Sequence, residues 1–298
     1  MLPVFNKQRN FWERVWEIVF CLSAFIPLAL LAFLINAIQI VFLPLLFIAP
    51  KLSRKLHQGV GYTWWCIAVV VMEKIKKIEF VYTGADVPLS ENVILIGNHQ
   101  SMADVAPILA LAYHKKSLPY LKWFAKDILK YVPGMGWGLY FAGNFFVKRD
   151  WLRDQRKIDK VFENVLKFRE PMWLVSFLEG TRITADKLKK SQIFSKDRQR
   201  PVLKHLLAPR TKGFEAAIKS LRTHLDAVYD ITIAFPEGTP DILTFFSGCI
   251  HRIDVHVRRF PIDSIPFTDK EISDWVWKVF EEKDELIKYF IRHHRFPA

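Results

Sequence analysis

Residues 92–115, NVILIGNHQSMADVAPILALAYHK, place a polar heptapeptide between two apolar segments. The run NVILIGN (92–98) has the length and the aliphatic content of a buried strand. SMADVAPILALAYHK (101–115) is typical of a helix that starts just after the strand ends. Strands and helices alternate along the rest of the chain in the same way, which predicts an α/β fold, a sheet with helices packed on it.

The expected elements follow from the positions of apolar runs and glycines. Residues 117–132 are predicted to form a strand and then a helix. Residues 133–150 are predicted to be a glycine-punctuated loop that ends in a strand, and residues 183–208 a long basic loop. The other expected strands are 77–84, 172–177, 229–235 and 251–262, and the other expected helices are 154–169, 213–224 and 273–293.

Charge is concentrated in one part of the chain. The formal net charge is +13, and residues 148–222 hold 20 Lys and Arg against 9 Asp and Glu. A basic surface of this kind favours an anionic partner such as anionic lipid, a phosphorylated substrate or nucleic acid. The three cysteines show neither CxxC nor Cys/His ligand spacing, so we expect no metal site and no disulfide framework.

A long apolar run dominates the amino-terminal quarter. From Ile18 to Ala49 the strongly polar side chains are Ser23, Asn36 and Gln39. The run is too long for the apolar part of a cleaved signal peptide, roughly 7–15 residues, and longer than one upright span of about 20 residues. A membrane segment is predicted, with residues 1–75 as the membrane-inserted region and residues 76–298 as the catalytic domain.

Two arrangements of this membrane segment remain open. Pro27, Asn36 and Pro44 could break the run into a tight helical hairpin, or it could form one tilted span. Basic residues on both sides favour cytoplasmic ends. Residues 61–72, GYTWWCIAVVVM, are either a helix at the membrane surface or a buried core helix.

The heptapeptide NHQSMAD (98–104) offers a catalytic pair. A strand–loop–helix turn can bring His99 and Asp104 together, so that Asp104 fixes the imidazole tautomer and the other ring nitrogen serves as a base. The structural alternative is a capping box formed by Ser101 and Asp104. Both interpretations remain open at this stage.

Cations recur beside predicted strand and helix ends, where ligands bind in open α/β sheets. They suit a phosphate group, because arginine makes bidentate contacts and lysine makes point-charge contacts. The residues are Lys148, Arg149, Arg182, Arg210 and Lys212.

The ordered set NHQSMAD, GNFFVKR, FLEGTR and a strand ending in Phe-Pro resembles the glycerolipid acyltransferase family, over about 140 residues. That family includes the lysophosphatidate acyltransferases. The resemblance implies a mixed sheet flanked by helices and preceded by a membrane-inserted helical segment. Leu178 and Met102 depart from the commonest pattern, and together with PRTKGF (209–214) they resemble the branch that acylates other lysophospholipids, such as lysophosphatidylinositol.

The resemblance also implies roles. His99 would be the general base and Asp104 its partner. Lys148, Arg149 and Arg182 would bind phosphate, and Glu179, Gly180 and Thr181 would shape the turn. Pro236 would match the fourth motif of the set, the strand that ends in Phe-Pro. FPEGTP (235–240) repeats Glu-Gly-Thr but ends in Pro240, which has neither charge nor backbone N–H. We therefore expect FLEGTR to be the working turn.

The implied function is transfer of a fatty acyl group to the sn-2 hydroxyl of 1-acylglycerol-3-phosphate. The acyl donor would be acyl-CoA or acyl-carrier protein, with no further cofactor. The expected location is a bacterial inner membrane with a cytoplasmic catalytic face, or the endoplasmic reticulum in a eukaryote.

Two other functions were considered. A thioesterase or lysophospholipase is less consistent with the cations that suit a phosphate group. A membrane-tethered binder of anionic lipid or nucleic acid would not require the pair of His99 and Asp104, so we expect no nucleic-acid partner.

Overall fold

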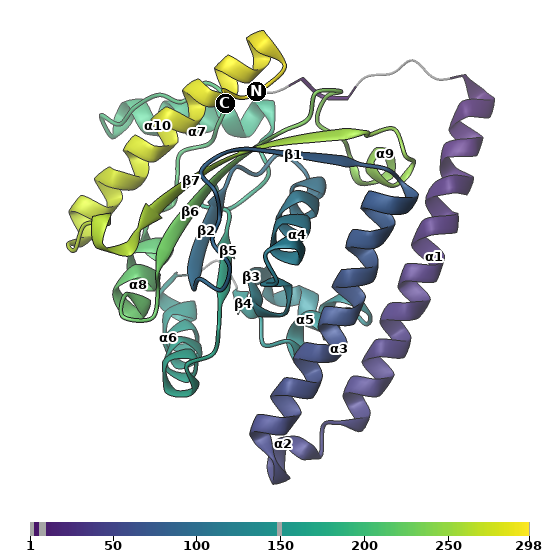
Figure 1. Ribbon diagram of the computed structural model, residues 1–298. Coiled ribbons are helices and arrows are strands. Elements are labelled where there is room, and N and C mark those ends of the chain that lie inside the picture. Colours follow the sequence, from purple (N-terminus) through teal and green to yellow (C-terminus); the bar gives the residue numbers. More distant parts are fainter. Residues whose placement is uncertain (1–2, 6–9, 148–150, 298) are drawn as a thin grey trace.

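A seven-stranded sheet forms the centre of the molecule (Figure 1), and the computed structural model describes residues 3–5, 10–147 and 151–297. The strand order is β1-β7-β6-β2-β5-β3-β4. All neighbours are parallel except β6 and β7, so β1 and β7 run opposite to the other five. The strands are β1 (Glu79–Gly84), β2 (Val93–Gly97), β3 (Leu121–Lys126), β4 (Phe145–Val147), β5 (Trp173–Ser176), β6 (Ala227–Ala234) and β7 (Arg252–Pro261).

Helices cover both faces of this mixed sheet. Figure 1 shows α6, α8 and α10 on one side and α3 and α4 on the other. The helices are α1 (Phe11–Val41), α2 (Leu45–Ile48), α3 (Pro50–Val70), α4 (Val105–His114), α5 (Met135–Phe141), α6 (Trp151–Phe168), α7 (Ala185–Asp197), α8 (Lys212–Leu221), α9 (Ile242–Phe246) and α10 (Asp269–His293). The predicted α/β class with a mixed sheet is confirmed.

Strand β2 explains why the sheet is covered on both sides. All five of its residues are buried. Ile94 and Ile96 belong to the core beneath α6, α8 and α10, whereas Val93 and Leu95 belong to the core beneath α4. Side chains alternate between the two faces of a strand, so a continuous aliphatic run requires an apolar layer on each face.

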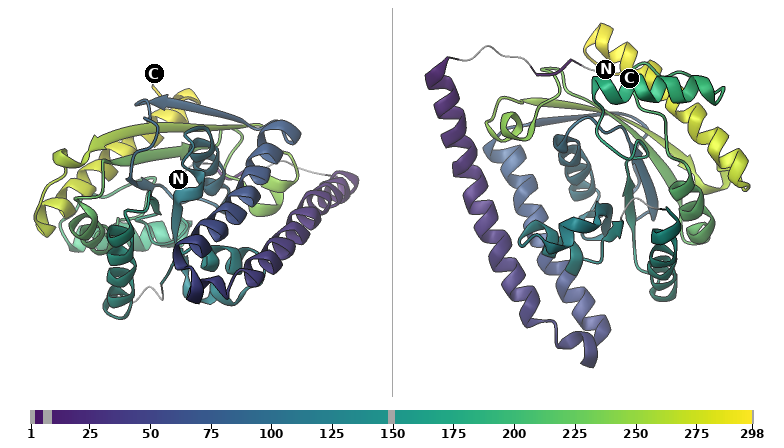
Figure 2. Two further views of the ribbon diagram at one scale, coloured as in Figure 1. Left: turned by 60° about the horizontal axis from the view of Figure 1, so that its bottom comes forward. Right: turned by 180° about the vertical axis from the view of Figure 1, so that it is seen from behind.

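The amino-terminal apolar run forms one long helix that lies outside the α/β layers. Figure 2 shows α1 running beside α3, with α3 between α1 and the sheet. Pro27 lies inside α1 without ending it, and the chain turns only at residues 42–49. The hairpin therefore consists of α1 and α3 and is not folded within residues 18–49.

Of the two interpretations of residues 61–72, the structure favours a helix packed within the protein, because most of these residues form the carboxyl half of α3, which packs on α1 and α4. Two other sequence-based expectations are wrong in detail. Residues 135–141 form α5 within the predicted loop, despite two glycines. Residues 185–197 form α7 within the predicted long loop, because the Thr184 side chain accepts from the backbone N–H of Lys187 and caps the helix.

A buried ion pair joins the carboxyl-terminal helix to the centre of the sheet. Lys283 Nζ on α10 lies 2.6 Å from Asp230 Oδ1 on β6, and both side chains are fully buried. Lys283 Nζ also donates to the carbonyl oxygen of Ile231, at 2.9 Å, and Arg258 Nη2 donates to Asp230 Oδ2, at 2.7 Å. Burial lowers the pKa of Lys283, so the lysine depends on Asp230 to remain charged.

Loss of the Asp230 charge should destabilise the fold. We expect Asp230→Asn to lower the free energy of unfolding by about 3 kcal/mol or more, because Lys283 would be left buried without its counter-ion. The matched control is Lys219→Ala, which removes the exposed pair with Asp269 and should cost less than about 1 kcal/mol. Denaturant unfolding in detergent measures both, and equal losses in the two variants would contradict the account.

Candidate active site

The predicted site residues come together because three neighbouring parallel strands end at one edge of the sheet. His99 follows β2, Glu179 follows β5 and Pro236 follows β6. Strands β6, β2 and β5 are adjacent in the sheet and run in the same direction. This edge is where open α/β sheets bind ligands.

His99 and Asp104 form the predicted pair. His99 Nδ1 lies 3.0 Å from Asp104 Oδ2. The Asp104 side chain is fully buried, whereas the His99 side chain is 17% exposed. With Nδ1 donating its proton to the carboxylate, Nε2 carries the free lone pair and can accept a proton from a bound hydroxyl.

Asp104 also caps the helix that follows, so the predicted capping bonds and the contact with His99 occur together. Its Oδ2 atom accepts from the backbone N–H groups of Gln100 and Ser101, at 2.6 and 2.9 Å. The Ser101 hydroxyl accepts in turn from the N–H of Ala103. Burial raises the pKa of the Asp104 carboxyl, and the bonds from His99, Ser101 and Gln100 oppose this effect. The capping bonds fix the orientation of the carboxylate that holds His99.

The imidazole is held from its flat side by Phe177, the first residue of FLEGTR. The two rings stack with centroids 4.2 Å apart and planes 14° apart. Two constraints, the ring contact and the bond to Asp104, therefore define the direction of Nε2. The sequence-based reasoning missed Phe177; its position next to the Glu-Gly-Thr turn was the available signal.

Glu179 connects the His99 loop to two other segments. Its Oε1 atom accepts from the backbone N–H of His99, at 2.7 Å, and its Oε2 atom accepts from the N–H of Leu207, at 2.9 Å. The N–H of Ile183 donates to the carbonyl oxygen of His99 at 3.0 Å. Burial raises the pKa of Glu179 to about 8, although the two N–H donors act against this.

Gly180 allows Arg210 to lie against the turn. Gly180 has a φ of +68°, and a Cβ atom there would lie 3.0 Å from Cδ of Arg210 and 3.1 Å from its Nε. The backbone N–H of Arg210 donates to the carbonyl oxygen of Leu178. Arg182, Arg210 and Lys212, the first residue of α8, are exposed. The structure thus brings Arg210 to FLEGTR from a part of the chain about 30 residues away.

Lys187 is a further cation at this turn. Its Nζ donates to the Thr181 hydroxyl, at 2.8 Å, and to the carbonyl oxygen of Arg182, at 3.0 Å. This contact was not expected, because residues 183–208 were predicted to form a loop. The sequence signal was Thr184, which caps α7 and so places Lys187, in the first turn of that helix, against FLEGTR.

The second Glu-Gly-Thr sequence lies on the other side of the His99 loop. FPEGTP follows β6, and the Thr239 hydroxyl donates to Oε1 of Gln100 at 2.7 Å. Gln100 Nε2 donates to the carbonyl oxygen of Ile233. The side-chain amide of Asn98 donates to the same carbonyl oxygen and accepts from the backbone N–H of Ile233. FPEGTP is therefore a turn at the end of a strand that supports the loop carrying His99.

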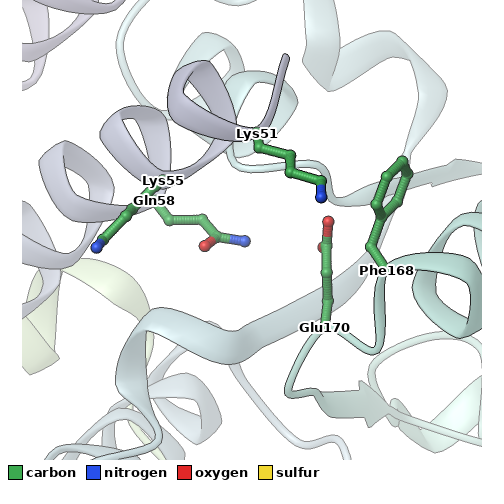
Figure 3. A pocket seen from close by; sticks show the side chains of 5 residues that line it. All are labelled: Lys51, Lys55, Gln58, Phe168 and Glu170. Carbon is green, nitrogen blue, oxygen red and sulfur yellow. The ribbon is translucent and has the colours of Figure 1, made fainter. Parts of the chain in front are cut away.

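Lys148 and Arg149 lie outside the described residues. They follow β4, which is parallel to β3 and ends at Val147. Within residues 3–5, 10–147 and 151–297, no group of three or more His, Cys, Asp or Glu side chains could hold a metal ion. A pocket in the described part of the chain lies away from His99, between α3 and the end of α6 (Figure 3).

The arrangement combines an oriented base with several cations. His99 can remove a proton from a hydroxyl group, and Arg210 and Lys187 contact the turn that begins beside it. A substrate that carries both a hydroxyl and a phosphate a few atoms apart fits this combination.

Comparison with known proteins identifies the family. A model of the acyltransferase family matches residues 72–235, and a model of the acyltransferase carboxyl terminus matches residues 244–298. The structure of the 1-acyl-sn-glycerophosphate (LPA) acyltransferase PlsC from Thermotoga maritima is similar, with a TM-score of 0.58 and 16% sequence identity. The match covers 94% of this chain and 98% of PlsC and shows the shared fold.

Curated relatives carry related names. The human 1-acyl-sn-glycerol-3-phosphate acyltransferase gamma is 32% identical over 89% of this chain and 72% of its own length. The probable 1-acyl-sn-glycerol-3-phosphate acyltransferase 5 of Arabidopsis thaliana is 31% identical over 83% of this chain and 66% of its own length. The chain thus spans about two thirds of the length of such relatives. With its ordered motifs, its fold and these matches, the chain belongs to the acyltransferase family.

Proposed function

We propose that the protein transfers a fatty acyl group from a thioester to the sn-2 hydroxyl of 1-acylglycerol-3-phosphate and so forms phosphatidate. One observation carries the proposal: the pair of His99 and Asp104 lies at the same sheet edge as the FLEGTR turn and its cations. The names of the relatives support this acceptor.

The reaction needs no covalent protein intermediate. Nε2 of His99 takes the proton of the acceptor hydroxyl while the hydroxyl oxygen attacks the thioester carbonyl. The tetrahedral intermediate collapses, the C–S bond breaks, and the thiolate leaves with the proton that His99 returns. Asp104 stabilises the transient imidazolium because its carboxylate lies 3.0 Å from Nδ1.

Phosphate recognition falls to the cations around FLEGTR. Arg182 and Arg210 can each bind a phosphate bidentately, and Lys187 and Lys212 can add point charges. Lys148 and Arg149 carry the same role from the resemblance to the family. Water needs no such site as an acceptor, so this set favours transfer over hydrolysis.

The acyl donor is proposed to be acyl-CoA or acyl-carrier protein, with no other cofactor. Both donors present phosphate or carboxylate groups, which suits the basic region that includes α7. Lys189 and Lys190 are exposed on this helix, one turn beyond its contact with FLEGTR. This placement would leave the acceptor phosphate and the donor on neighbouring parts of one basic surface.

The anchor is proposed to lie along the bilayer surface and not to cross it. Among the described residues, one helix, α1, is long and apolar enough to span. Its amino-terminal half contacts the α9 region, where Cys249 Sγ donates to Glu17 at 3.3 Å; near its other end, Asn36 accepts from the N–H of Gly134 at 2.8 Å. Both ends of the apolar helix thus contact the same α/β body, which lies on one side of the membrane. The exposed face of the helix would then enter only the cytoplasmic leaflet.

A second acceptor class is favoured by specific residues. Leu178, Met102 and PRTKGF depart from the commonest family pattern, and the lysocardiolipin acyltransferase 1 of Gallus gallus is 31% identical over 84% of this chain. The alternative acceptor is a lysophospholipid whose phosphate carries a larger head group. The base and the turn would act in the same way.

The two members of the pair should differ in importance. We expect His99→Ala to lower kcat/KM for acyl transfer to lysophosphatidate at least about hundredfold, because the general base is lost. Asp104→Asn should lower it less, since His99 remains. Asp86→Asn, which removes an exposed carboxylate, is the matched control and should have no effect. Full activity of His99→Ala would contradict the mechanism.

Glu179 should give acceptor binding a dependence on pH. With its pKa raised to about 8 by burial, the carboxyl is mostly neutral at pH 7 and becomes negative above pH 8. The negative charge repels the acceptor phosphate, which is already doubly ionised there. KM for lysophosphatidate should therefore rise between pH 7.5 and 9 in the wild type, where the window follows from that pKa of about 8. Glu179→Gln should lack this rise; an equal rise in both proteins would exclude Glu179 as the cause.

Spin labels can test the in-plane anchor. Leu22, Phe33 and Ile40 lie on one exposed face of α1. Labels at these positions should report similar depths in reconstituted bilayers. A spanning helix would separate the first and last by about 27 Å along the bilayer normal, at 1.5 Å per residue, and that result would overturn the placement.

A further inference from the structure

A basic pocket lies near the tip of the α1–α3 hairpin, away from the candidate active site. It has a volume of about 270 Å³ and is lined by Lys51, Lys55 and Gln58 of α3 and by Phe168 and Glu170 at the end of α6 (Figure 3). This volume is below the range of roughly 300–1,000 Å³ that holds whole drug-sized ligands. The pocket suits a head group better than a complete lipid.

The pocket is separated from the proposed catalytic site by the length of the sheet. Glu170 precedes β5, whereas Glu179 follows it. The two sites therefore lie at opposite ends of the same strand. Substitutions in the pocket can be made without touching His99, Asp104 or the phosphate cations.

Helix α3 presents two different faces at this level. Ser53 and His57 are buried, and the His57 ring stacks on Phe141 of α5 with centroids 5.4 Å apart. Lys51, Lys55 and Gln58 follow the spacing i, i+4, i+7 and lie together on another face. Figure 3 shows Lys51 and Gln58 directed toward the end of α6, with the Lys51 ammonium and the Glu170 carboxylate pointing toward one another, whereas the Lys55 ammonium points away from Glu170.

The position of the pocket identifies its occupant. The short α2 immediately precedes it, and Phe47 and Ile48 on α2 are 90% and 80% exposed. Apolar side chains of an in-plane anchor enter the bilayer to a depth of about 5–10 Å. Lys51 and Lys55 follow Ile48 by three and seven residues, so an anchor that lies in the plane of the bilayer keeps their backbone near the level of the apolar tip. Lysine side chains beside buried apolar residues extend to the head groups, which places the two ammonium groups near the lipid phosphates.

We propose that this pocket binds the phosphate of an anionic phospholipid at the membrane surface. Lys51 supplies a point charge, Gln58 supplies an amide donor, and the flexible side chain of Lys55 can turn to add a second charge. A bound lipid would fix the tip of the hairpin at one end of the molecule while the catalytic edge faces the substrates at the other. This inference rests on the in-plane anchor proposed above.

The test uses the full chain, transferred from detergent to vesicles and separated by flotation. The vesicles contain either phosphatidylcholine alone or phosphatidylcholine with one fifth phosphatidylglycerol. The variant is Lys51→Gln with Lys55→Gln. The matched control is Lys270→Gln with Lys278→Gln, which removes the same charge from exposed positions on α10, on the other face of the sheet.

A specific loss is expected. Each lysine near an anionic surface contributes about fivefold in binding, so the pocket variant should bind phosphatidylglycerol vesicles roughly 25-fold more weakly. Its binding to phosphatidylcholine vesicles and its acyl transfer in mixed micelles should not change. An equal loss in the α10 control, or no loss in the pocket variant, would overturn the proposal. Failure of the wild type to bind phosphatidylcholine vesicles would instead contradict the anchor.

Lysine acetylation of the wild type gives a second readout. It tests for a lipid in the pocket even when flotation shows complete binding to both kinds of vesicle. A water-soluble acetylating reagent should modify Lys51 and Lys55 severalfold more slowly on phosphatidylglycerol vesicles than on phosphatidylcholine vesicles. Lys270 and Lys278 should react at the same rate on both. Equal rates for Lys51 and Lys55 on the two vesicles would exclude a lipid phosphate in the pocket.

Discussion

The buried carboxyl of Glu179 holds the active edge together. It accepts from the backbone N–H of His99 on one side and of Leu207 on the other, and so joins segments that lie 80 and 28 residues away in the chain. Without this acceptor, two buried N–H groups would lack a partner, at a cost of about 1–3 kcal/mol each. The position of His99, the proposed base, therefore depends on a residue of the turn that is proposed to bind phosphate. In the proposed reaction, this one side chain would couple the base to the phosphate site.

Much of this edge could be predicted from sequence because it follows from local rules. The aliphatic run of β2 required a doubly covered strand, and the spacing of His99 and Asp104 suited the turn after it. Long-range contacts could not be predicted. Nothing in the spacing shows that Arg210 lies against Gly180, or that Thr239 reaches Gln100. The error at α5 arose because its two glycines weaken the local helix preference, which its packing on α1 and α3 outweighs. The error at α7 arose because its polar sequence lacks a clear apolar period, while the Thr184 cap starts the helix.

The proposed anchor would use an apolar helix without crossing the bilayer. Apolar composition alone made α1 a candidate span, and only its contacts to the α/β body at both ends favour the in-plane arrangement. Pro27 is tolerated within α1 because one missing backbone bond does not end a helix of 31 residues that packs on α3. Cations lie in two separate places on the surface. One group lies at the sheet edge with FLEGTR, and the other, Lys51 and Lys55, lies beside the apolar tip formed by α2.

The most direct test of the account compares two acceptors that differ only in the phosphate. We would measure kcat/KM with oleoyl-CoA for 1-acylglycerol-3-phosphate and for 1-monoacylglycerol, in the wild type and in Arg182→Gln. The account predicts that the wild type strongly prefers the phosphorylated acceptor and that Arg182→Gln loses most of this preference, with its rate on monoacylglycerol unchanged. An unchanged preference in the variant, or equal use of both acceptors by the wild type, would contradict the central claim that the FLEGTR turn selects the acceptor by its phosphate.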